Sequence, residues 1–434
     1  MYREKVKELF DYTVDIRRRM HTNPELSGLE EETVKLVKEE LEKIGIEYVE
    51  VNNGGVLAFI KGNKKTDEAK TIIIRADLDA LPFNEPEKNL KNKRLVRSNK
   101  KGVMHACGHD GHTAMALTSA KILYENRDDF SGKVIFCFER SEETGENCKY
   151  IMAYLGKNEI NIDTSFAIHV ASEYESGVMA IKSGGINAGS MMFDITIKGE
   201  SGHGSRPYLA NNPLDCFVDI YEGLKSLRMD KFSPFEPMTY SIGVVEMGNQ
   251  FNQIPDKLRF KGSVRFFDRK EVGYKFYREF QSLIINKVKV HNCRVVFNTY
   301  SRPHFPIIND EDLTGLANEV IKDELGEGFV TRANPSMGSD SFAVYTAQWP
   351  GLYLMLGIRN EELGSGAALH STMFDLDEEA LKNGVAATVR YVVEYLNSRG
   401  IKVEDGPYKN NIKGLFIEES RSQEEIEEIY DTIA

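Results

Sequence analysis

The densest cluster of reactive side chains is the segment HACGHDGH, residues 105–112. It contains His105, His109 and His112, with Cys107 between the first two, although the whole chain has only 9 histidines. A thiolate and an imidazole two residues apart, just before a predicted helix, can share a transition metal ion. The alternative is a buried structural cysteine beside hydrogen-bonded histidines, because free cysteine is usually a small core residue.

Acidic side chains follow two predicted buried strands. The run TIIIRAD ends at Asp77, with Asp79 two residues further on, and the run KVIFCFE is followed by Glu142 and Glu143. In open α/β sheets, ligands bind beyond the carboxyl ends of parallel strands. We therefore expect these four side chains to lie in one crevice.

Two more histidines are expected in the same crevice. His169 lies at the end of the strand predicted over 165–170, and His370 follows the strand predicted over 352–357 by a loop. Together with Glu143 and the HACGHDGH segment, they provide more donors than one tetrahedral zinc ion needs. The sequence thus predicts a site for two metal ions, with the ligands Cys107, His109, Glu143, His169 and His370.

The adjacent acids Glu142 and Glu143 are suited to two different chemical roles. One can bind metal while the other takes a proton from metal-bound water. The alternative is a solvated helix surface, where such pairs are common, as at residues 31–32, 39–40 and 361–362. The position directly after a buried strand separates Glu142 and Glu143 from these other pairs.

The elements that must position these residues alternate between strand and helix. Predicted strands at 71–77, 133–139 and 165–170 are separated by predicted helices near 112–123 and 148–155. This alternation predicts an α/β fold with a parallel sheet, and the same pattern returns after residue 300.

The segment 187–300 has a different pattern. Four alternating strands and two helices follow one another in the order β-α-β-β-α-β, which is typical of a ferredoxin-like module. We therefore expect a sheet-and-helix catalytic domain of residues 1–186 and 301–434, into which an α+β domain of residues 187–300 is inserted.

The composition is that of a folded, acidic protein. Among 434 residues, 55 Lys and Arg stand against 67 Asp and Glu, a net charge of -12 that argues against nucleic-acid or anionic-membrane binding. The 5 cysteines, without close pairing, suit a reducing compartment. With no signal peptide and no membrane-spanning stretch in the sequence, we expect a soluble cytoplasmic protein.

Four stretches match the motifs of one enzyme family: RRRMHTNPELSGLEEET, RADLDALPFNE, HACGHDGHTAM and ALHSTMFDLDEEAL. Over residues 17–396 the chain closely resembles the metal-dependent aminoacylase and carboxypeptidase family of amidohydrolases. Its nearest subgroup contains hippurate hydrolase, auxin-conjugate hydrolases, N-acetyldiaminopimelate deacetylase and aminobenzoyl-glutamate hydrolase. The resemblance implies a dinuclear catalytic domain and a lid domain that often forms the dimer interface, so we expect a homodimer or higher homo-oligomer.

The resemblance also implies roles for single residues. It makes Cys107 a bridging ligand of two divalent metal ions, zinc or manganese with cobalt or nickel as further candidates, and Glu142 the general base. His203, in the lid motif GESGHGSRP, matches a histidine that stabilises the developing oxyanion, often from a partner subunit. Asn252 and Arg265 match candidates for gripping a substrate carboxylate.

Asp79 is expected to steer a metal ligand, as carboxylates outside a coordination sphere do. Asp77 falls where relatives outside the subgroup place a metal histidine. From the residues alone, His203 in its Gly-rich loop is a turn residue, and Arg265 could equally be a surface charge.

The sequence departs from the subgroup at three places. Glu139 and Arg140 replace a Gln-Pro before the acidic pair, and TGENC replaces a Gly-rich run after it. Asp340 and Ser341 stand where an acidic pair followed by Phe is common. Because these segments are expected to line the substrate pocket, the identity of the substrate does not transfer from the subgroup.

The loop 88–101 contains seven Lys or Arg residues and no acid. A solvated loop is the first interpretation, and electrostatic steering of anionic substrates is the second.

The sequence as a whole predicts a metal-dependent hydrolase of N-acyl amino acids or short peptides. Three alternatives stay open: dipeptidase or carboxypeptidase activity, a non-catalytic metal-binding or amino-acid-binding protein, and a thiol enzyme with Cys107 as nucleophile. A thiol enzyme would remain active with a chelator but not after alkylation.

Overall fold

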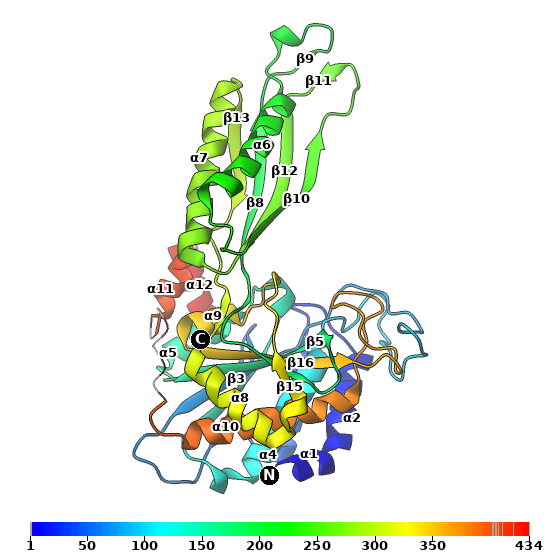
Figure 1. Cartoon of the computed structure of the whole chain (residues 1–434), viewed down its shortest axis with the longest axis vertical. Coiled ribbons are helices and arrows are strands. Elements are labelled where there is room, and N and C mark those ends of the chain that lie inside the picture. The colour runs from blue at the N-terminus through cyan, green and yellow to red at the C-terminus, as the bar shows by residue number, and fades with distance from the viewer. Residues whose placement is uncertain are drawn as a thin grey trace.

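The computed structural model describes residues 2–401, 403, 406, 408–409, 411–419 and 421–433. A 10-stranded mixed sheet lies at the centre of the larger body, with helices on both faces (Figure 1). In sheet order its strands are β1 (Glu47–Val51), β2 (Gly55–Lys61), β4 (Lys133–Glu139), β3 (Thr71–Asp77), β5 (Thr164–Glu175), β16 (Gly351–Arg359), β14 (Ile307–Asn309) and β7 (Gly184–Asn187). Two short strands extend the sheet beside β16, namely β6 (Met179–Ile181) and β15 (Val330–Arg332).

The four central strands β4, β3, β5 and β16 run parallel to one another, as the alternation of elements predicts. Antiparallel pairings at β1, β2 and β7 make the whole sheet mixed. Ile72 and Ile74 of β3 pack into the core on one face and Ile73 into the core on the other. A strand that is buried on both faces has a continuous run of apolar residues. Such runs identify these central strands in the sequence.

Two groups of helices cover the sheet. One face carries α1 (Arg3–Glu8), α2 (Phe10–Thr22), α3 (Glu31–Ile44), α4 (His109–Glu125), α8 (Glu311–Leu325) and α10 (Leu381–Asn397). The other carries α5 (Cys148–Lys157), α9 (Ala343–Gln348), α11 (Ile412–Glu418) and α12 (Gln423–Thr432). In the part of the chain that the structure describes, no helix is long and apolar enough to cross a membrane.

The chain leaves the central sheet after β7 and returns to it at β14. Between them, a four-stranded antiparallel sheet has the order β10-β12-β8-β13. Its strands are β8 (Gly189–Lys198), β10 (Met238–Met247), β12 (Lys257–Phe266) and β13 (Arg294–Tyr300), and its helices are α6 (Pro213–Lys231) and α7 (Tyr274–Val290). The helices share one separate apolar core with the sheet. This is the β-α-β-β-α-β arrangement that the sequence predicts.

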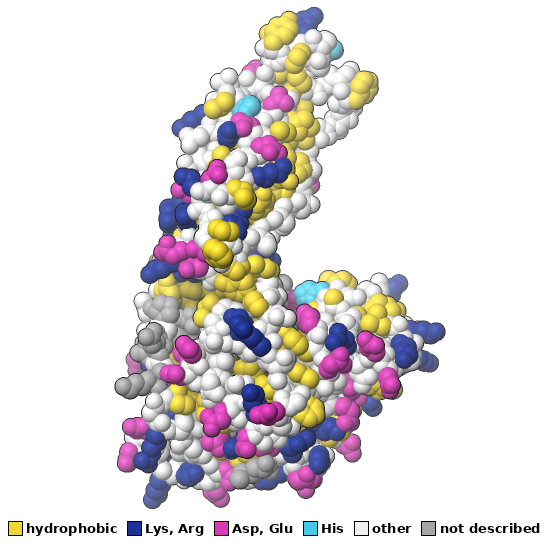
Figure 2. Space-filling model, in the orientation of Figure 1, with side chains coloured by type: hydrophobic (Ala, Val, Ile, Leu, Met, Phe, Trp, Pro, Cys, Tyr) yellow, Lys and Arg dark blue, Asp and Glu magenta, His cyan; other side chains and the backbone are white. Residues whose placement is uncertain are grey.

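The inserted domain, from β8 to β13, extends away from the central sheet (Figure 1). The short strands β9 (Gly202–His203) and β11 (Gln253–Ile254) pair with each other at its far end. Hydrophobic side chains lie on its surface up to that end (Figure 2). At the junction with the larger body, Glu418 of α11 accepts hydrogen bonds from Tyr274 at 2.7 Å and from Arg269 at 3.2 Å. The C-terminal helix α11 therefore contacts the base of the inserted domain.

Candidate metal centre and active site

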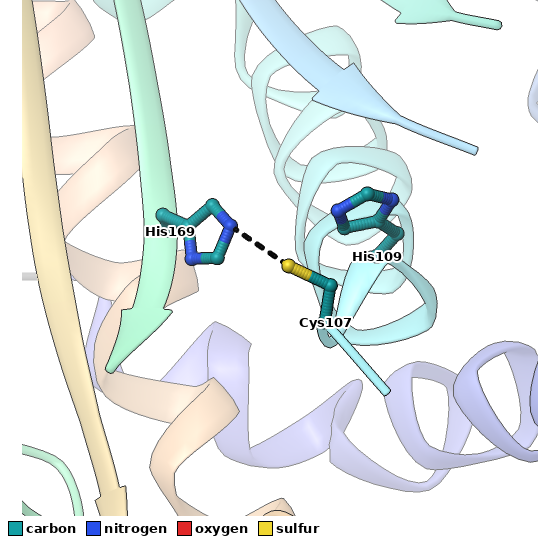
Figure 3. Close-up of side chains that lie close together, drawn as sticks. All are labelled: Cys107, His109 and His169. Atoms are coloured by element: carbon teal, nitrogen blue, oxygen red, sulfur yellow. Dashed lines mark hydrogen bonds between the residues drawn. The ribbon is translucent and has the colours of Figure 1, made fainter. Parts of the chain in front are cut away.

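The segment Cys107-Gly108-His109 forms a tight turn at the start of α4. Gly108 has a φ of 88°, in the left-handed region that favours glycine. A Cβ at this position would lie 2.4 Å from Val170 Cγ2 of β5, so the turn requires glycine for space as well. The turn brings Cys107 and His109 close to His169 of β5 (Figure 3).

Cys107, His109 and His169 form a first group of candidate ligands. All three are buried, and their ligand atoms lie within 4.8 Å of one another. Cys107 Sγ is 3.5 Å from His169 Nε2 (Figure 3). The other ring nitrogen of His169 lies 2.7 Å from the carbonyl oxygen of Val170 and can only donate to it. The Nε2 lone pair of His169 therefore faces the thiol, as in a metal-binding histidine.

Asp79 contacts two candidate ligand residues, His109 and Glu143. Its Oδ1 is 3.1 Å from His109 Nδ1, and its Oδ2 accepts hydrogen bonds from Glu143 N at 3.0 Å and Ser27 Oγ at 2.6 Å. The remaining ring nitrogen of His109, Nε2, is buried without a hydrogen-bond partner among the described residues. Through these contacts Asp79 orients His109 and the backbone of Glu143, and its role beside a metal ion stays a prediction.

Cys107 also belongs to a second group, with Glu143 and His370. His370 Nε2 is 3.2 Å from Glu143 Oε1, and the side chain of His370 is 51% exposed. His370 has a φ of 61°, a left-handed conformation that costs roughly 1–3 kcal/mol in a residue other than glycine. Such strain is concentrated at functional sites. Because the side chain of His370 is half exposed, solvent can reach the second group.

The two groups fit a pair of metal ions. Cys107 is common to both, and thiolate, imidazole and carboxylate are donors that zinc and related ions bind. His109 Nε2 and Glu143 Oε1 are buried without hydrogen bonds from the described residues, which costs free energy unless a ligand meets them. Burial lowers the pKa of His169 to about 3 and so keeps the imidazole in its neutral, metal-binding form.

The surroundings of Cys107 do not suit a thiol nucleophile. Burial raises the pKa of its thiol, whereas reactive cysteines have a lowered pKa and partial exposure. A metal ion would offset this cost, because it binds and stabilises the thiolate. The structure therefore favours a ligand role over the thiol-enzyme alternative.

Glu142 lies in the turn after β4, beside His109 and Glu143. Glu30 holds this turn, since it accepts a hydrogen bond from Ser141 N at 2.8 Å and pairs with Arg140 Nε at 2.8 Å. Burial raises the pKa of Glu142 well above its usual value. A raised pKa suits a group that must take up a proton and return it near neutral pH.

The structure gives the three histidines of the HACGHDGH segment different environments. His112 has both ring nitrogens occupied: Nδ1 lies 2.7 Å from Asp77 Oδ1, and Nε2 accepts from Val170 N at 2.9 Å. Neither nitrogen of the buried His105 has a hydrogen bond within the described residues, and burial lowers its pKa to about 4. His109 alone of the three combines a free nitrogen with the neighbouring thiol and carboxylates.

Two predicted site residues do not reach this centre within one chain. His203 and Asn252 lie together on the exposed β9–β11 arm, where Gly204 N donates to Asn252 O at 2.8 Å. The arm is at the far end of the inserted domain (Figure 1). Along β12, eight residue steps separate Lys257, next to the arm, from Arg265, and at ~3.3 Å per residue they span about 26 Å.

Arg265 lies at the near end of β12. Its Nη1 donates to Ser339 Oγ at 2.6 Å, and Ser339 begins the loop that leads to Ser341. Within the described ranges no acidic side chain pairs with Arg265, and burial alone lowers its pKa. A half-buried guanidinium without a counter-ion fits an anion-binding role.

The basic loop 88–101 is largely exposed, as the first interpretation expects, but Arg94 is buried. Its guanidinium donates to the carbonyl oxygens of Phe374 and Thr372 at 2.6 and 2.8 Å. These residues follow His370 in the same loop, so Arg94 helps to fix a candidate ligand. Nothing in the charge pattern distinguishes Arg94 from its neighbours, and the sequence could not predict this contact.

Comparison with known proteins assigns the chain to a family. The model of peptidase family M20/M25/M40 matches residues 73–394. The chain belongs to this family, which confirms the resemblance of its motifs, and it is a metal-dependent hydrolase.

Two relatives and one solved structure illustrate the similarity. IAA-amino acid hydrolase ILR1-like 2 of Arabidopsis thaliana is 33% identical over 92% of this chain and 88% of its own length. Thermostable carboxypeptidase 2 of Saccharolobus solfataricus is 35% identical over 90% of this chain and 97% of its own length. The YxeP protein of Bacillus subtilis, a dinuclear metal-binding peptidase, has a TM-score of 0.76 at 28% identity, covering 91% of this chain and 100% of its own.

The turn at Gly108 gives a testable prediction. Gly108→Ala should weaken metal binding about 10-fold or more, because the added Cβ would displace both neighbouring ligand residues. Gly102→Ala is the matched control: its φ is 81°, and nothing lies within 4 Å of the Cβ position. Both changes carry the same backbone strain, roughly 1 kcal/mol. Metal content after dialysis against zinc or manganese checks this, and equal contents in the two variants would contradict it.

Proposed function

We propose that the protein is a dinuclear metal-dependent amidohydrolase that cleaves N-acyl amino acids or short peptides with a free carboxylate. The observation that carries this proposal is that two groups of candidate ligands share Cys107 beside Glu142. The similar chains support it, since they include an IAA-amino acid hydrolase, a carboxypeptidase and a dinuclear metal-binding peptidase.

Five side chains would hold the two ions: Cys107, His109, Glu143, His169 and His370. When bound, the ions lower the pKa of a water molecule and polarise the amide carbonyl. Zinc and manganese are the first candidates for this mixed set of donors, and cobalt or nickel also bind such sets.

Glu142 is the proposed general base. Its carboxylate lies within 4.8 Å of candidate ligand atoms of His109 and Glu143. It would take the proton of the attacking water and return it to the leaving amine. Burial raises its pKa and so favours the protonated form that the second step requires.

Arg265 would bind the carboxylate of the substrate. In this structure its partner is the neutral hydroxyl of Ser339, and a carboxylate forms the stronger, charge-assisted hydrogen bonds. N-acyl amino acids and peptides both end in a carboxylate, so this contact selects neither class over the other.

His203 and Asn252 would serve the active site of a second copy of the chain. Ser205 N donates to His203 Nδ1 at 3.1 Å, so Nε2 carries the ring proton of the neutral histidine and can donate it to an oxyanion. The neighbouring Phe251 is fully exposed, and β10 is an edge of its sheet. With the surface hydrophobic side chains of this domain (Figure 2), these are features of an interface, and they support a homodimer.

We also propose a cytoplasmic location. All five cysteines are free and buried, as expected in a reducing compartment. The net charge of -12 gives no support for nucleic-acid binding or attachment to an anionic membrane.

The role of Glu142 is tested by Glu142→Gln. The variant should keep both metals but lower kcat by ~10²–10⁴-fold, because an amide cannot take up the proton. Glu361→Gln, in an exposed Glu-Glu pair, is the control and should keep the parental rate. The assay is amine release from N-acetyl, N-benzoyl and indole-acyl amino acids and dipeptides, with added zinc or manganese and again with chelator.

Chelator should abolish amine release by the parent protein. Release that persists with chelator would contradict the metal-dependent mechanism, and parental turnover in Glu142→Gln would contradict the base assignment.

Arg265→Ala should raise KM about 10- to 100-fold for a substrate with a free carboxylate, because one charge-assisted contact is lost. With the carboxamide of the same substrate, parent and variant should differ little. Arg259→Ala on the same strand is the control, since Arg259 pairs with Asp194 within the inserted sheet. An equal loss on acid and amide would exclude carboxylate binding by Arg265.

The composite site is tested by mixing two impaired variants, His203→Ala and Glu142→Gln. In a mixed dimer, the subunit with intact Glu142 receives His203 from its partner, so one of the two sites is complete. Random exchange makes half of the dimers mixed, and the mixture should reach about a quarter of the parental rate. If verified subunit exchange gives no gain, His203 does not act across the interface.

A further inference from the structure

A buried group of charged side chains lies behind the proposed general base, and the mechanism above does not use it. Its centre is the buried Arg75. Arg75 Nη1 is 2.6 Å from Asp77, and Nη2 is 3.2 Å from both Glu139 and Asp340. Nη2 also donates to Ser341 Oγ at 2.6 Å. The Arg75 cluster is the set Arg75, Asp77, Glu139, Asp340 and Ser341.

Ser341 connects the Arg75 cluster to Glu142. Its backbone N–H donates to Glu142 Oε1 at 3.1 Å, and its hydroxyl donates to Glu139 Oε1. The other oxygen of Glu139 accepts the hydroxyl of Tyr345. The position of the Glu142 carboxylate therefore depends on where the cluster holds Ser341.

Asp340 fixes the same loop from the other side. Its Oδ2 accepts the hydroxyl of Tyr353 at 2.7 Å, and its Oδ1 accepts the backbone N–H of Phe342 at 2.7 Å. These bonds are buried, so the path of the backbone through Ser341 is set by the protein interior.

Arg75 is also a potential partner for Glu142. Its Nη2 is 4.0 Å from Glu142 Oε1, further than the 3.2 Å to Glu139 and Asp340. A buried cation that loses one anion is drawn to the next, because an uncompensated buried charge is costly. Without Glu139, Arg75 would draw Glu142 towards itself and away from the candidate metal ligands.

Two departures from the subgroup's pattern meet in this cluster. By the resemblance of its motifs, Glu139 stands where the subgroup usually has Gln, and Ser341 stands where a second acid before Phe is common. The side chains at these two positions are hydrogen-bonded to each other. Relative to the subgroup's pattern, this chain gains a carboxylate at residue 139 and loses one at residue 341. The number of acidic side chains around Arg75 is therefore unchanged.

We propose that Glu139 and Ser341 form one coupled unit that positions Glu142 for proton transfer. Glu139 keeps Arg75 from pairing with Glu142, and Ser341 directs its backbone N–H to Glu142 Oε1. Both act through Glu142 and are positioning residues. The inference rests on the proposed function, in which Glu142 is the general base.

The test is a double-substitution cycle. Glu139→Gln and Ser341→Asp are made separately and together, and kcat, KM and metal content are measured with the best substrate of the panel. Each single change alters the charge around Arg75 by one and should lower kcat ~10- to 100-fold, with KM and metal content within ~2-fold of the parent. The double variant keeps the charge and should regain a kcat within ~3-fold of the parent.

Glu139→Gln combined with Ser341→Asn is the matched control. Asn has the size of Asp without its charge, so this variant should remain as slow as Glu139→Gln alone. Recovery in the Asn variant equal to that in the Asp variant would overturn the proposal. So would a double variant whose loss is the product of the single losses, or single variants with parental kcat.

Ser341→Ala is measured beside the cycle, because larger changes in a buried cluster can prevent folding. It removes only the hydroxyl and should keep fold and metal while lowering kcat ~3- to 10-fold. The thermal unfolding midpoint follows the same cycle without substrate and should also recover in the Glu139→Gln, Ser341→Asp variant. A metal-loaded parent that hydrolyses nothing in the panel would refute the proposed function. An active parent whose kcat is insensitive to these changes would refute the positioning role alone.

Discussion

The pairing of buried charges at the carboxyl edge of the central sheet is the constraint on which the site depends. Asp79 holds His109 and the backbone of Glu143, and Glu30 holds the turn before Glu142. Removing one partner of a buried ion pair typically costs about 3–5 kcal/mol, because the other charge is left without compensation. The positions of the candidate ligands therefore depend on these buried charged residues.

The sequence predicted the centre of the fold because its signals are local. The runs at β3 and β4 are apolar over their whole length, and both strands have the predicted bounds, Thr71–Asp77 and Lys133–Glu139. Parallel strands place their carboxyl ends at one edge, so residues distant in the chain could be assigned to one crevice. The structure brings all five predicted metal ligands together there.

The supporting residues could not be predicted, because their partners are distant and their types are ordinary. Glu30 and Arg140 are 110 positions apart, and in sequence each looks like a surface charge. Arg75 lies inside an apolar strand, but its acidic partners come from other strands and from the loop at Asp340. Likewise, nothing in the HACGHDGH segment shows that His112 is fully hydrogen-bonded while a nitrogen of His109 has no hydrogen bond from the described residues.

The length of β12 determines which active site can be reached by the residues at each of its ends. Arg265 contacts Ser339 of its own chain, whereas His203 and Asn252 lie beyond the other end of the strand, about 26 Å along it. A fully extended tripeptide spans at most about 11 Å. One small substrate held by Arg265 therefore cannot reach His203 along the inserted sheet of the same chain. If Arg265 binds the substrate and His203 takes part in the same reaction, the strand length requires that His203 act in the site of another copy.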